Sequence, residues 1–335
     1  MLWAVLALFA GNLFTSLTVV AETCTTQSAL DPATRNSVAT QARNIASSVL
    51  TNNSAELHTL TAADLLKDFG ALQYLVATTS PKLAGTSPVV EQVYILDATD
   101  LKATSDAQFF CSLNNTTREV QFDIPSLPPA KYAFAIVDMV RTSGPTPAWR
   151  LSLLLRQDAA TAAWQLAGLY PKALTMAGHD GLWYWTQARQ FVKDKEQWNA
   201  WLYYRQAAQL LQPTPFILTT HLDKLHSEAA AAEPSSISDG ISATSPLVLK
   251  GSDGTEYHIT SLGLDDSGGF RAPDIAMRVQ VDSSAEQTAA HNTSAAVALL
   301  AAHPEFRKPF HGVMVIAEAP GQSPFSSEIT IAEIK

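Results

Sequence analysis

The apolar positions of the chain first follow a helical period. Between residues 31 and 50, apolar side chains recur three or four positions apart, which is the spacing of one face of an α-helix. Asp31 can cap the free amide groups at the start of such a helix, and Pro32 suits its first position. The pattern predicts a helix of about 19 residues from Pro32, with a buried stripe that consists of Val38, Ala42, Ile45 and Val49.

A second helical signal begins at Thr61. Thr61 and Asp64 have the spacing of a capping box, and Gly70 can adopt the left-handed conformation that ends many helices. The apolar residues between them are Leu65, Leu66 and Phe69. We therefore expect two helices ahead of the first strand.

Farther along, the period changes to two, which is typical of half-buried β-strands. Alternating apolar residues occupy 93–95, 120–124 and 149–155. Turn-forming residues separate 109–113 from 120–124, and 149–155 from 164–170. These spacings predict successive antiparallel hairpins.

The last of these hairpins reads Trp149-Arg-Leu-Ser-Leu-Leu-Leu and Trp164-Gln-Leu-Ala-Gly. Together with the two preceding helices, it makes residues 31–172 resemble the nuclear transport factor 2-like (cystatin-like cone) superfamily. The resemblance implies a curved antiparallel sheet around a cone. Members include isomerases, dehydratases and cyclases that use a carboxylate, Tyr or His inside the cone, and also proteins that only bind ligands or partners. Fold alone does not choose between these functions.

Within this domain, Asp138 is the strongest candidate for a catalytic carboxylate. It shares strand parity with Tyr132, Phe134 and Ile136, so it should face the same side of the sheet as those side chains. A buried carboxylate there can serve as a general base, with Tyr94 and His58 as further candidate pocket residues. The alternative is that Asp138 ends its strand or faces solvent.

Residues 179–213 return to helical spacing and predict a helical hairpin, with a further helix up to residue 227. The small and aromatic pattern of Ala188, Ala200, Tyr204 and Ala207 makes the segment resemble a single tetratricopeptide repeat.

Many aromatic side chains lie in this hairpin, and a lone helical pair cannot bury them. We expect its tryptophans to pack against flanking segments. The alternative is an exposed patch that docks a ligand or a partner, with Trp183, Trp185 and Trp201 as the candidate binding residues.

Residues 228–243 lose both periods and are rich in turn formers, which predicts a linker. The segment 244–335 then alternates strand-like and helix-like patterns. We interpret it as a small C-terminal α+β domain of no identified family. The whole chain is thus expected to be an α+β protein of several segments.

Residues 1–21 have the apolar run and small-residue end of a signal peptide, which predicts export to the periplasm or the extracellular space, with no membrane span left after cleavage. The alternative is a retained membrane anchor. The two cysteines, Cys24 and Cys111, fit one disulfide in an oxidising compartment, and the alternatives are two buried thiols or a lipid-modified Cys24.

Charge and metal-binding patterns narrow the function further. The chain of 335 residues carries a net charge of −9 without a basic stripe, which argues against nucleic acid as a partner. The sequence places His291, His303, Glu305 and His311 near one another, but they lack the spacing of a helical ligand pair. We therefore predict neither a metal site nor a cofactor.

These observations favour a non-catalytic binding or interaction protein, because the common catalytic motifs are absent from the sequence. The expected partner is an unidentified small molecule or an envelope protein. The alternative is an isomerase-type or dehydratase-type enzyme that uses Asp138 in the cone.

Overall fold

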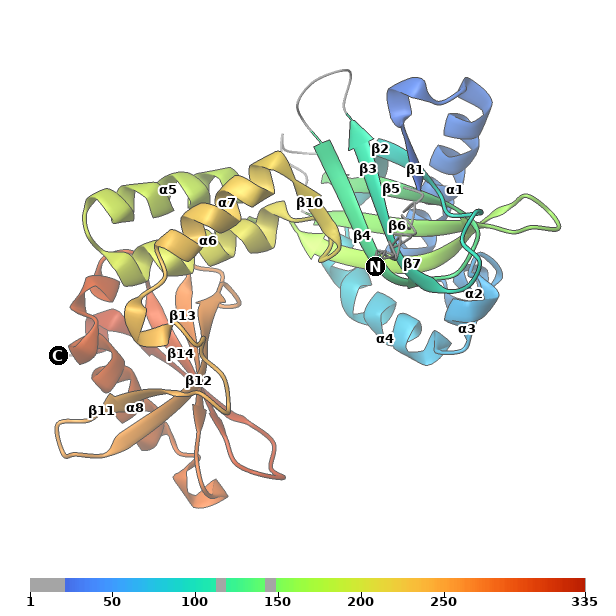
Figure 1. The fold of residues 1–335 in the computed structure, drawn as a ribbon. Coiled ribbons are helices and arrows are strands. Elements are labelled where there is room, and N and C mark those ends of the chain that lie inside the picture. The colour runs from blue at the N-terminus through green and yellow to red at the C-terminus, as the bar shows by residue number, and fades with distance from the viewer. Residues whose placement is uncertain (1–21, 113–118, 142–148, 335) are drawn as a thin grey trace, which may run out of the picture.

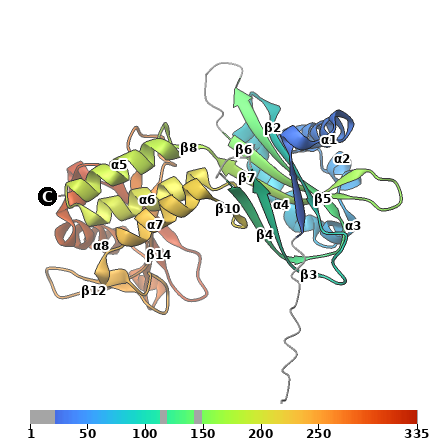
Figure 2. The same cartoon turned by 45° about the horizontal axis from the view of Figure 1, so that its top comes forward.

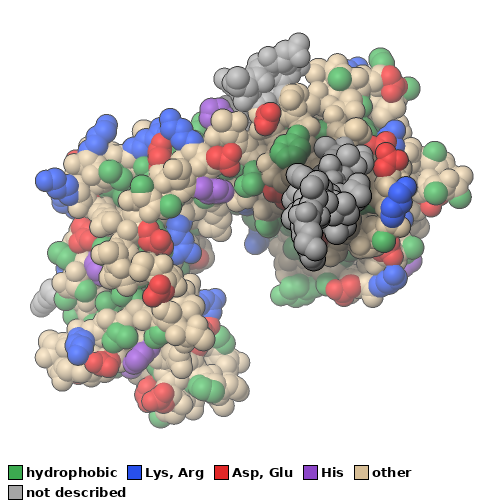
Figure 3. All heavy atoms as spheres, viewed as in Figure 1, with side chains coloured by type: hydrophobic (Ala, Val, Ile, Leu, Met, Phe, Trp, Pro, Cys, Tyr) green, Lys and Arg blue, Asp and Glu red, His purple; other side chains and the backbone are tan. Residues whose placement is uncertain are grey.

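The computed structural model describes residues 22–112, 119–141 and 149–334, so the predicted signal peptide lies outside it. The chain has the expected mixed α+β class and forms two lobes (Figure 1). Figure 3 shows Lys and Arg side chains interspersed with Asp and Glu on one face, with a wide gap between the lobes. Within the described ranges, no helix is both long and apolar enough to cross a membrane.

The first lobe holds four helices and most of the strands in the described part of the chain. Its helices are α1 (Pro32–Leu50), α2 (Ser54–Thr59), α3 (Ala63–Leu66) and α4 (Phe69–Thr79). Its strands are β1 (Thr23–Thr26), β2 (Thr86–Asp97), β3 (Ser105–Ser112), β4 (Glu119–Leu127), β5 (Lys131–Arg141), β6 (Trp149–Gln157), β7 (Trp164–Ala173) and β10 (Ile217–Thr219).

A five-stranded antiparallel sheet of order β1-β2-β5-β6-β7 forms the middle of this lobe. Strand alternation sends Val93 and Val137 toward a core shared with α1, α2 and α4, and sends Tyr94 and Phe134 to the other face. That second face is covered by a three-stranded sheet of order β10-β4-β3 (Figure 2).

The space between the two sheets is filled by aromatic side chains. The Phe122 ring lies edge-on to Tyr94 and Phe134, at centroid distances of 5.2 Å in both cases. Phe216 makes similar contacts with Phe134 and Tyr170, at 5.9 and 5.2 Å. The interior of the first lobe is therefore a packed aromatic core at these positions.

The predicted first helix is confirmed to the residue. α1 starts at Pro32, and the Asp31 carboxylate accepts a hydrogen bond from the Thr34 amide at 2.9 Å. The predicted hairpins of β3 with β4 and of β6 with β7 are also present.

The predicted second helix is wrong in its start and its end. The Thr61 hydroxyl donates to the Leu57 carbonyl oxygen at 2.6 Å, so it closes the end of α2 and does not cap a new helix. Gly70 lies inside α4, which continues to Thr79. Local spacing favoured one helix where the chain forms two, α3 and α4. The expectation of two helices ahead of the first strand is also wrong, because β1 precedes α1 and four helices lie between β1 and β2.

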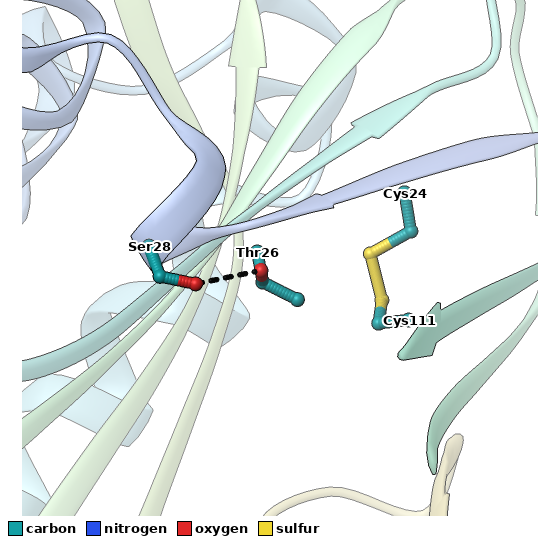
Figure 4. The surroundings of a disulfide bond; sticks show 4 residues. All are labelled: Cys24, Thr26, Ser28 and Cys111. Carbon is teal, nitrogen blue, oxygen red and sulfur yellow. Dashed lines mark hydrogen bonds between the residues drawn. A yellow bond between two sulfur atoms is a disulfide. The ribbon is translucent and has the colours of Figure 1, made fainter. Parts of the chain in front are cut away.

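The predicted disulfide between Cys24 and Cys111 is confirmed (Figure 4). It connects β1, the edge strand of the five-stranded sheet, to β3 of the smaller sheet. The bond spans 87 residues of sequence. It therefore ties the start of the described chain to both layers of the first lobe.

The second lobe contains four more helices and a five-stranded sheet. The short strands β8 (Thr175–Met176) and β9 (His179–Asp180) precede it. Its helices are α5 (Gly181–Lys193), α6 (Gln197–Leu211), α7 (Thr220–Ala231) and α8 (Ala289–Ala302). Its strands, in sheet order, are β11 (Leu247–Lys250), β12 (Glu256–Asp265), β13 (Asp274–Gln280), β14 (Gly312–Glu318) and β15 (Phe325–Thr330).

The helical hairpin and the C-terminal sheet share one hydrophobic core. Trp198 and Trp201 of α6 belong to the same buried cluster as Ile259 and Phe306. α7 extends through Ala231, so the predicted linker begins inside a helix. Apart from β10, the segment 179–227 is thus part of the second lobe rather than a separate unit.

The lobes are joined by strand pairing and by a side-chain hydrogen bond, among other contacts. β10, which follows α6, pairs with β4 in the first lobe. The Lys172 ammonium group of β7 donates to the Gln212 carbonyl oxygen, and burial lowers the pKa of Lys172 to about 8. Residues 212–219, which directly follow α6, are therefore attached to the first lobe.

Candidate functional site

Asp138 lies in β5 directly beside Arg150 of β6, because the antiparallel register pairs these two positions. Arg150 Nε donates to Asp138 Oδ1 at 2.7 Å, and Nη2 donates to Oδ2 at 3.1 Å. Asp138 is only 6% exposed. Both carboxylate oxygens are therefore held by a guanidinium group in a bidentate pair, which competes with any role as a free base.

The structure does not bring the other two predicted pocket residues to Asp138. Tyr94 pairs with Phe134, four residues along β5 from Asp138, which corresponds to about 13 Å along the strand. His58 lies on the opposite side of the sheet, where its ring contacts Phe69 at a centroid distance of 4.9 Å. Burial raises the pKa of the Tyr94 hydroxyl.

Two of the three candidate tryptophans are core residues. Trp185 and Trp201 are 7% and 5% exposed. Trp185 Nε1 donates to Glu228 at 2.8 Å, and Trp201 lies under the Arg205 guanidinium group. Trp183 is half-buried and stacks on His179 at 3.7 Å. Trp185 and Trp201 therefore pack in the interior, as we expected of these tryptophans. They cannot contribute to an exposed docking patch.

A groove of 650 Å³ lies on the helical side of the first lobe, at the ends of α1, α2 and β7. This volume falls in the range typical of small-ligand sites, roughly 300–1,000 Å³. Its walls contain amide, hydroxyl and apolar groups, and none of its lining residues is charged. They are Ala33, Asn36, Ser37, Thr40, Gln41, Thr59, Leu60, Ala163, Trp164 and Gln165.

The wall formed by α1 follows from helical geometry. Positions 33, 36, 37, 40 and 41 are three or four residues apart, so they lie on one face of the helix. The opposite stripe, which starts at Val38, is buried against the sheet. A one-sided helix thus offers a row of short uncharged polar groups to the groove.

Several polar groups in the groove have unused hydrogen-bonding capacity. Within the described part of the chain, the side chains of Asn36, Ser37, Gln41 and Gln165 make no hydrogen bond to protein. Each amide can donate and accept, and the hydroxyl can do both. Gln165 also lines an adjoining depression of 500 Å³, so the polar surface continues past the end of the groove.

Three potential metal ligands meet at one end of the second-lobe sheet. Atoms of Asp274, His311 and Glu328 lie within 4.8 Å of one another. His311 belongs to the histidine group that lacks the spacing of a helical ligand pair, and its two partners here, Asp274 and Glu328, are far from that group in sequence. They are brought together by the pairing of β14 with both β13 and β15.

The other residues of that histidine-rich region lie elsewhere. His303 is buried against Trp198 at a ring distance of 4.4 Å, and this burial lowers the pKa of His303. Its nearest acid is Glu305, at 3.8 Å. His291 contacts the Tyr257 ring at 5.2 Å. Only His311 of this group therefore belongs to the three-residue cluster.

Neither the groove nor this cluster can be compared with a known site. No protein-family model, no curated protein and no solved structure matches the chain. The similarities of 31–172 to the nuclear transport factor 2-like superfamily and of 179–213 to a tetratricopeptide repeat therefore stay predictions.

Proposed function

We propose that this protein is an exported, non-catalytic binding protein that holds an uncharged, hydroxyl-rich ligand, such as a short oligosaccharide, in the groove beside α1. The observation that carries this proposal is the lining of that groove. It combines free amide and hydroxyl groups with no charged side chain.

The chemistry of the lining favours this ligand class. Sugar hydroxyls donate and accept hydrogen bonds, as do the free side chains of Asn36, Gln41 and Gln165. Ala33 and Leu60 supply apolar surface for the C–H groups of such a ligand. An ionic ligand would lose its hydration shell without gaining an opposite charge in the groove, which disfavours it.

Two further observations support the rest of the proposal. The Cys24–Cys111 disulfide is typical of proteins in oxidising compartments, which agrees with export to the periplasm or the extracellular space. The alternative enzyme would need a free acid in the cone. Asp138 is bound by Arg150 through both oxygens, which favours binding over catalysis.

Saturation-transfer NMR with maltohexaose, cellohexaose and chitohexaose tests the proposal. We expect at least one of these sugars to receive saturation from the protein and to be recovered unchanged in mass. Asn36→Ala and Gln165→Ala should weaken that signal several-fold, because they remove groove amides.

Asn44→Ala is the matched control, since Asn44 is an exposed asparagine of the same helix that does not line the groove. Equal loss in Asn44→Ala and Asn36→Ala, or no transfer to any of the three sugars, would contradict the proposed site. Cleavage of the bound sugar would contradict the non-catalytic role.

A further inference from the structure

Asp274 is buried without a full set of partners. It is 1% exposed at the first position of β13, and its Oδ2 atom has no hydrogen-bond partner within the described residues. An unmet buried polar atom costs about 1–3 kcal/mol, and more when it is charged. Buried carboxylates are normally paired with a cation or bound to a metal.

The local backbone leaves space for this carboxylate. Gly312 begins β14 next to Asp274, and a Cβ atom added there would lie 2.8 Å from Asp274 Oδ1. It would also lie 2.8 Å from the Ile329 carbonyl oxygen, which belongs to backbone and cannot easily move. A side chain at residue 312 would therefore displace the Asp274 carboxylate.

His311 is held next to Asp274 by both neighbouring strands. Its backbone amide donates to the Pro273 carbonyl oxygen at 3.1 Å, and its own carbonyl oxygen accepts from the Ile331 amide at 3.0 Å. Phe270 stacks on the imidazole ring at 3.6 Å. The His311 backbone is thus held by residues directly before β13 and directly after β15, and its ring lies against an aromatic side chain.

The donor atoms have the spacing of an incomplete coordination shell. His311 Nδ1 lies 3.0 Å from Asp274 Oδ1 and 3.8 Å from Glu328 Oε1. In a tetrahedral zinc site with bonds near 2.1 Å, neighbouring ligand atoms are about 3.4 Å apart. Small movements of the His311 and Glu328 side chains, which are 26% and 32% exposed, would bring all three atoms to such distances.

We infer that Asp274, His311 and Glu328 bind a divalent first-row transition metal such as Zn²⁺. One imidazole nitrogen and two carboxylate oxygens form a donor set suited to these ions, and three protein ligands leave a coordination position for water or a ligand. This site is independent of the groove in the first lobe.

Local charge also favours a cation. Asp265 is the cross-strand neighbour of Asp274, so three carboxylates and one imidazole are gathered at this end of the sheet. One oxygen of Asp265 is already occupied by the Ser267 amide, at 2.9 Å. A metal ion would balance this negative charge and give the unpartnered Oδ2 atom of Asp274 a positively charged partner.

Titration of the chelator-stripped full protein with Zn²⁺ in competition with a chromophoric zinc indicator tests the inference. We expect one ion per chain. His311→Ala should weaken binding at least about tenfold, the size of effect seen even for supporting residues of metal sites. His258→Ala is the matched control, because His258 is an exposed histidine on the same sheet and should leave affinity unchanged.

Co²⁺ in place of Zn²⁺ gives a second readout, since a low-symmetry nitrogen and oxygen site should intensify its visible absorption. If His311→Ala does not fold, Glu328→Gln replaces it, because Glu328 is partly exposed and its amide keeps the shape of the side chain. No saturable binding, or equal affinity in wild type and in the folded cluster variant, overturns the inference. In that case Asp274 and His311 form a simple hydrogen-bonded pair.

Discussion

Each lobe contains a five-stranded sheet, and each sheet buries one aspartate. In the first lobe, Asp138 accepts two hydrogen bonds from Arg150, its neighbour on the next strand. In the second lobe, the strand neighbours of Asp274 supply an acid and a glycine, Asp265 and Gly312, and one of its oxygens has no partner. The two aspartates are buried to a similar extent, but only Asp138 has an arginine beside it.

This difference distinguishes a carboxylate with a structural role, Asp138, from one that is a candidate metal ligand, Asp274. Burial of a charge in a protein is tolerated when a partner of opposite charge compensates for lost hydration. Arg150 provides that compensation for Asp138, whereas Asp274 has only a histidine that is shared with Glu328. The missing partner, rather than burial itself, indicates the metal site.

The largest expected effect concerns the disulfide, which only the first lobe has among the described residues. Cys24→Ser combined with Cys111→Ser should lower the free energy of unfolding of that lobe by about 4 kcal/mol, because a long loop in the unfolded chain is released. Hydrogen exchange should show lost protection in β2 and β5 and unchanged protection in α6. Equal losses in both lobes would show that they unfold as one unit.

Breaking the ion pair of Asp138 comes next. Arg150→Met leaves a buried carboxylate without its cation, so we expect a loss of about 3 kcal/mol in urea unfolding. Adding Asp138→Leu should restore part of that loss. Arg43→Met, at an exposed position of α1, should change stability by less than about 0.5 kcal/mol. If the Arg150 variant is as stable as this control, Asp138 is not the paired structural residue described above.

The second lobe also contains a fully partnered acid, Glu228, which sharpens the comparison. Its pKa is lowered to about 2, chiefly by hydrogen bonds from Arg189, with a further bond from Trp185. The folded state therefore binds this proton less readily than the unfolded state. The stabilisation is complete above the ordinary value of 4.5 and is lost as the pH falls toward 2.

Glu228→Gln should accordingly cost about 2 kcal/mol at neutral pH and should reduce the acid sensitivity of the second lobe. Urea unfolding at a series of pH values measures both effects. An unchanged pH profile in the variant would mean that the Arg189 contact does not stabilise the charged form.

The smallest effect is expected at Asp274 itself. In the presence of a chelator, Asp274→Asn should raise the free energy of unfolding by up to about 1 kcal/mol, since no cation partner is lost and the unmet buried group is no longer charged. Asp282→Asn, at an exposed position after β13, serves as the control. A loss as large as that of Arg150→Met would place Asp274 in the same structural class as Asp138.

Local patterns predicted much of the secondary structure. The helix that starts at Pro32 was predicted correctly because its apolar stripe and its N-cap both lie within the same short segment. The Thr61 helix was predicted wrongly because the Thr61 hydroxyl bonds backward to Leu57, a choice that the spacing to Asp64 does not reveal. The alanines after Glu228 continue α7, although their composition suggested a linker.

The candidate sites were harder to predict. Asp138 was found from strand parity, but its pairing with Arg150 depends on the register between β5 and β6. His311 was noticed, yet its two partners lie 37 and 17 residues away in sequence. The polar face of α1 was visible as helical spacing, but only the neighbouring end of β7 makes it one wall of a groove.

By itself, the sequence determined the mixed α+β class, the first helix, the main hairpins and the pair of cysteines available for a disulfide, because periodicity and residue type act over a few neighbouring positions. Tertiary structure decided which core each helix joins, which strands become neighbours and which charged groups meet. These choices depend on strand register and on burial summed over distant segments. Arg150 therefore satisfies one buried aspartate, while Gly312 and His311 leave the other able to accept a metal ion.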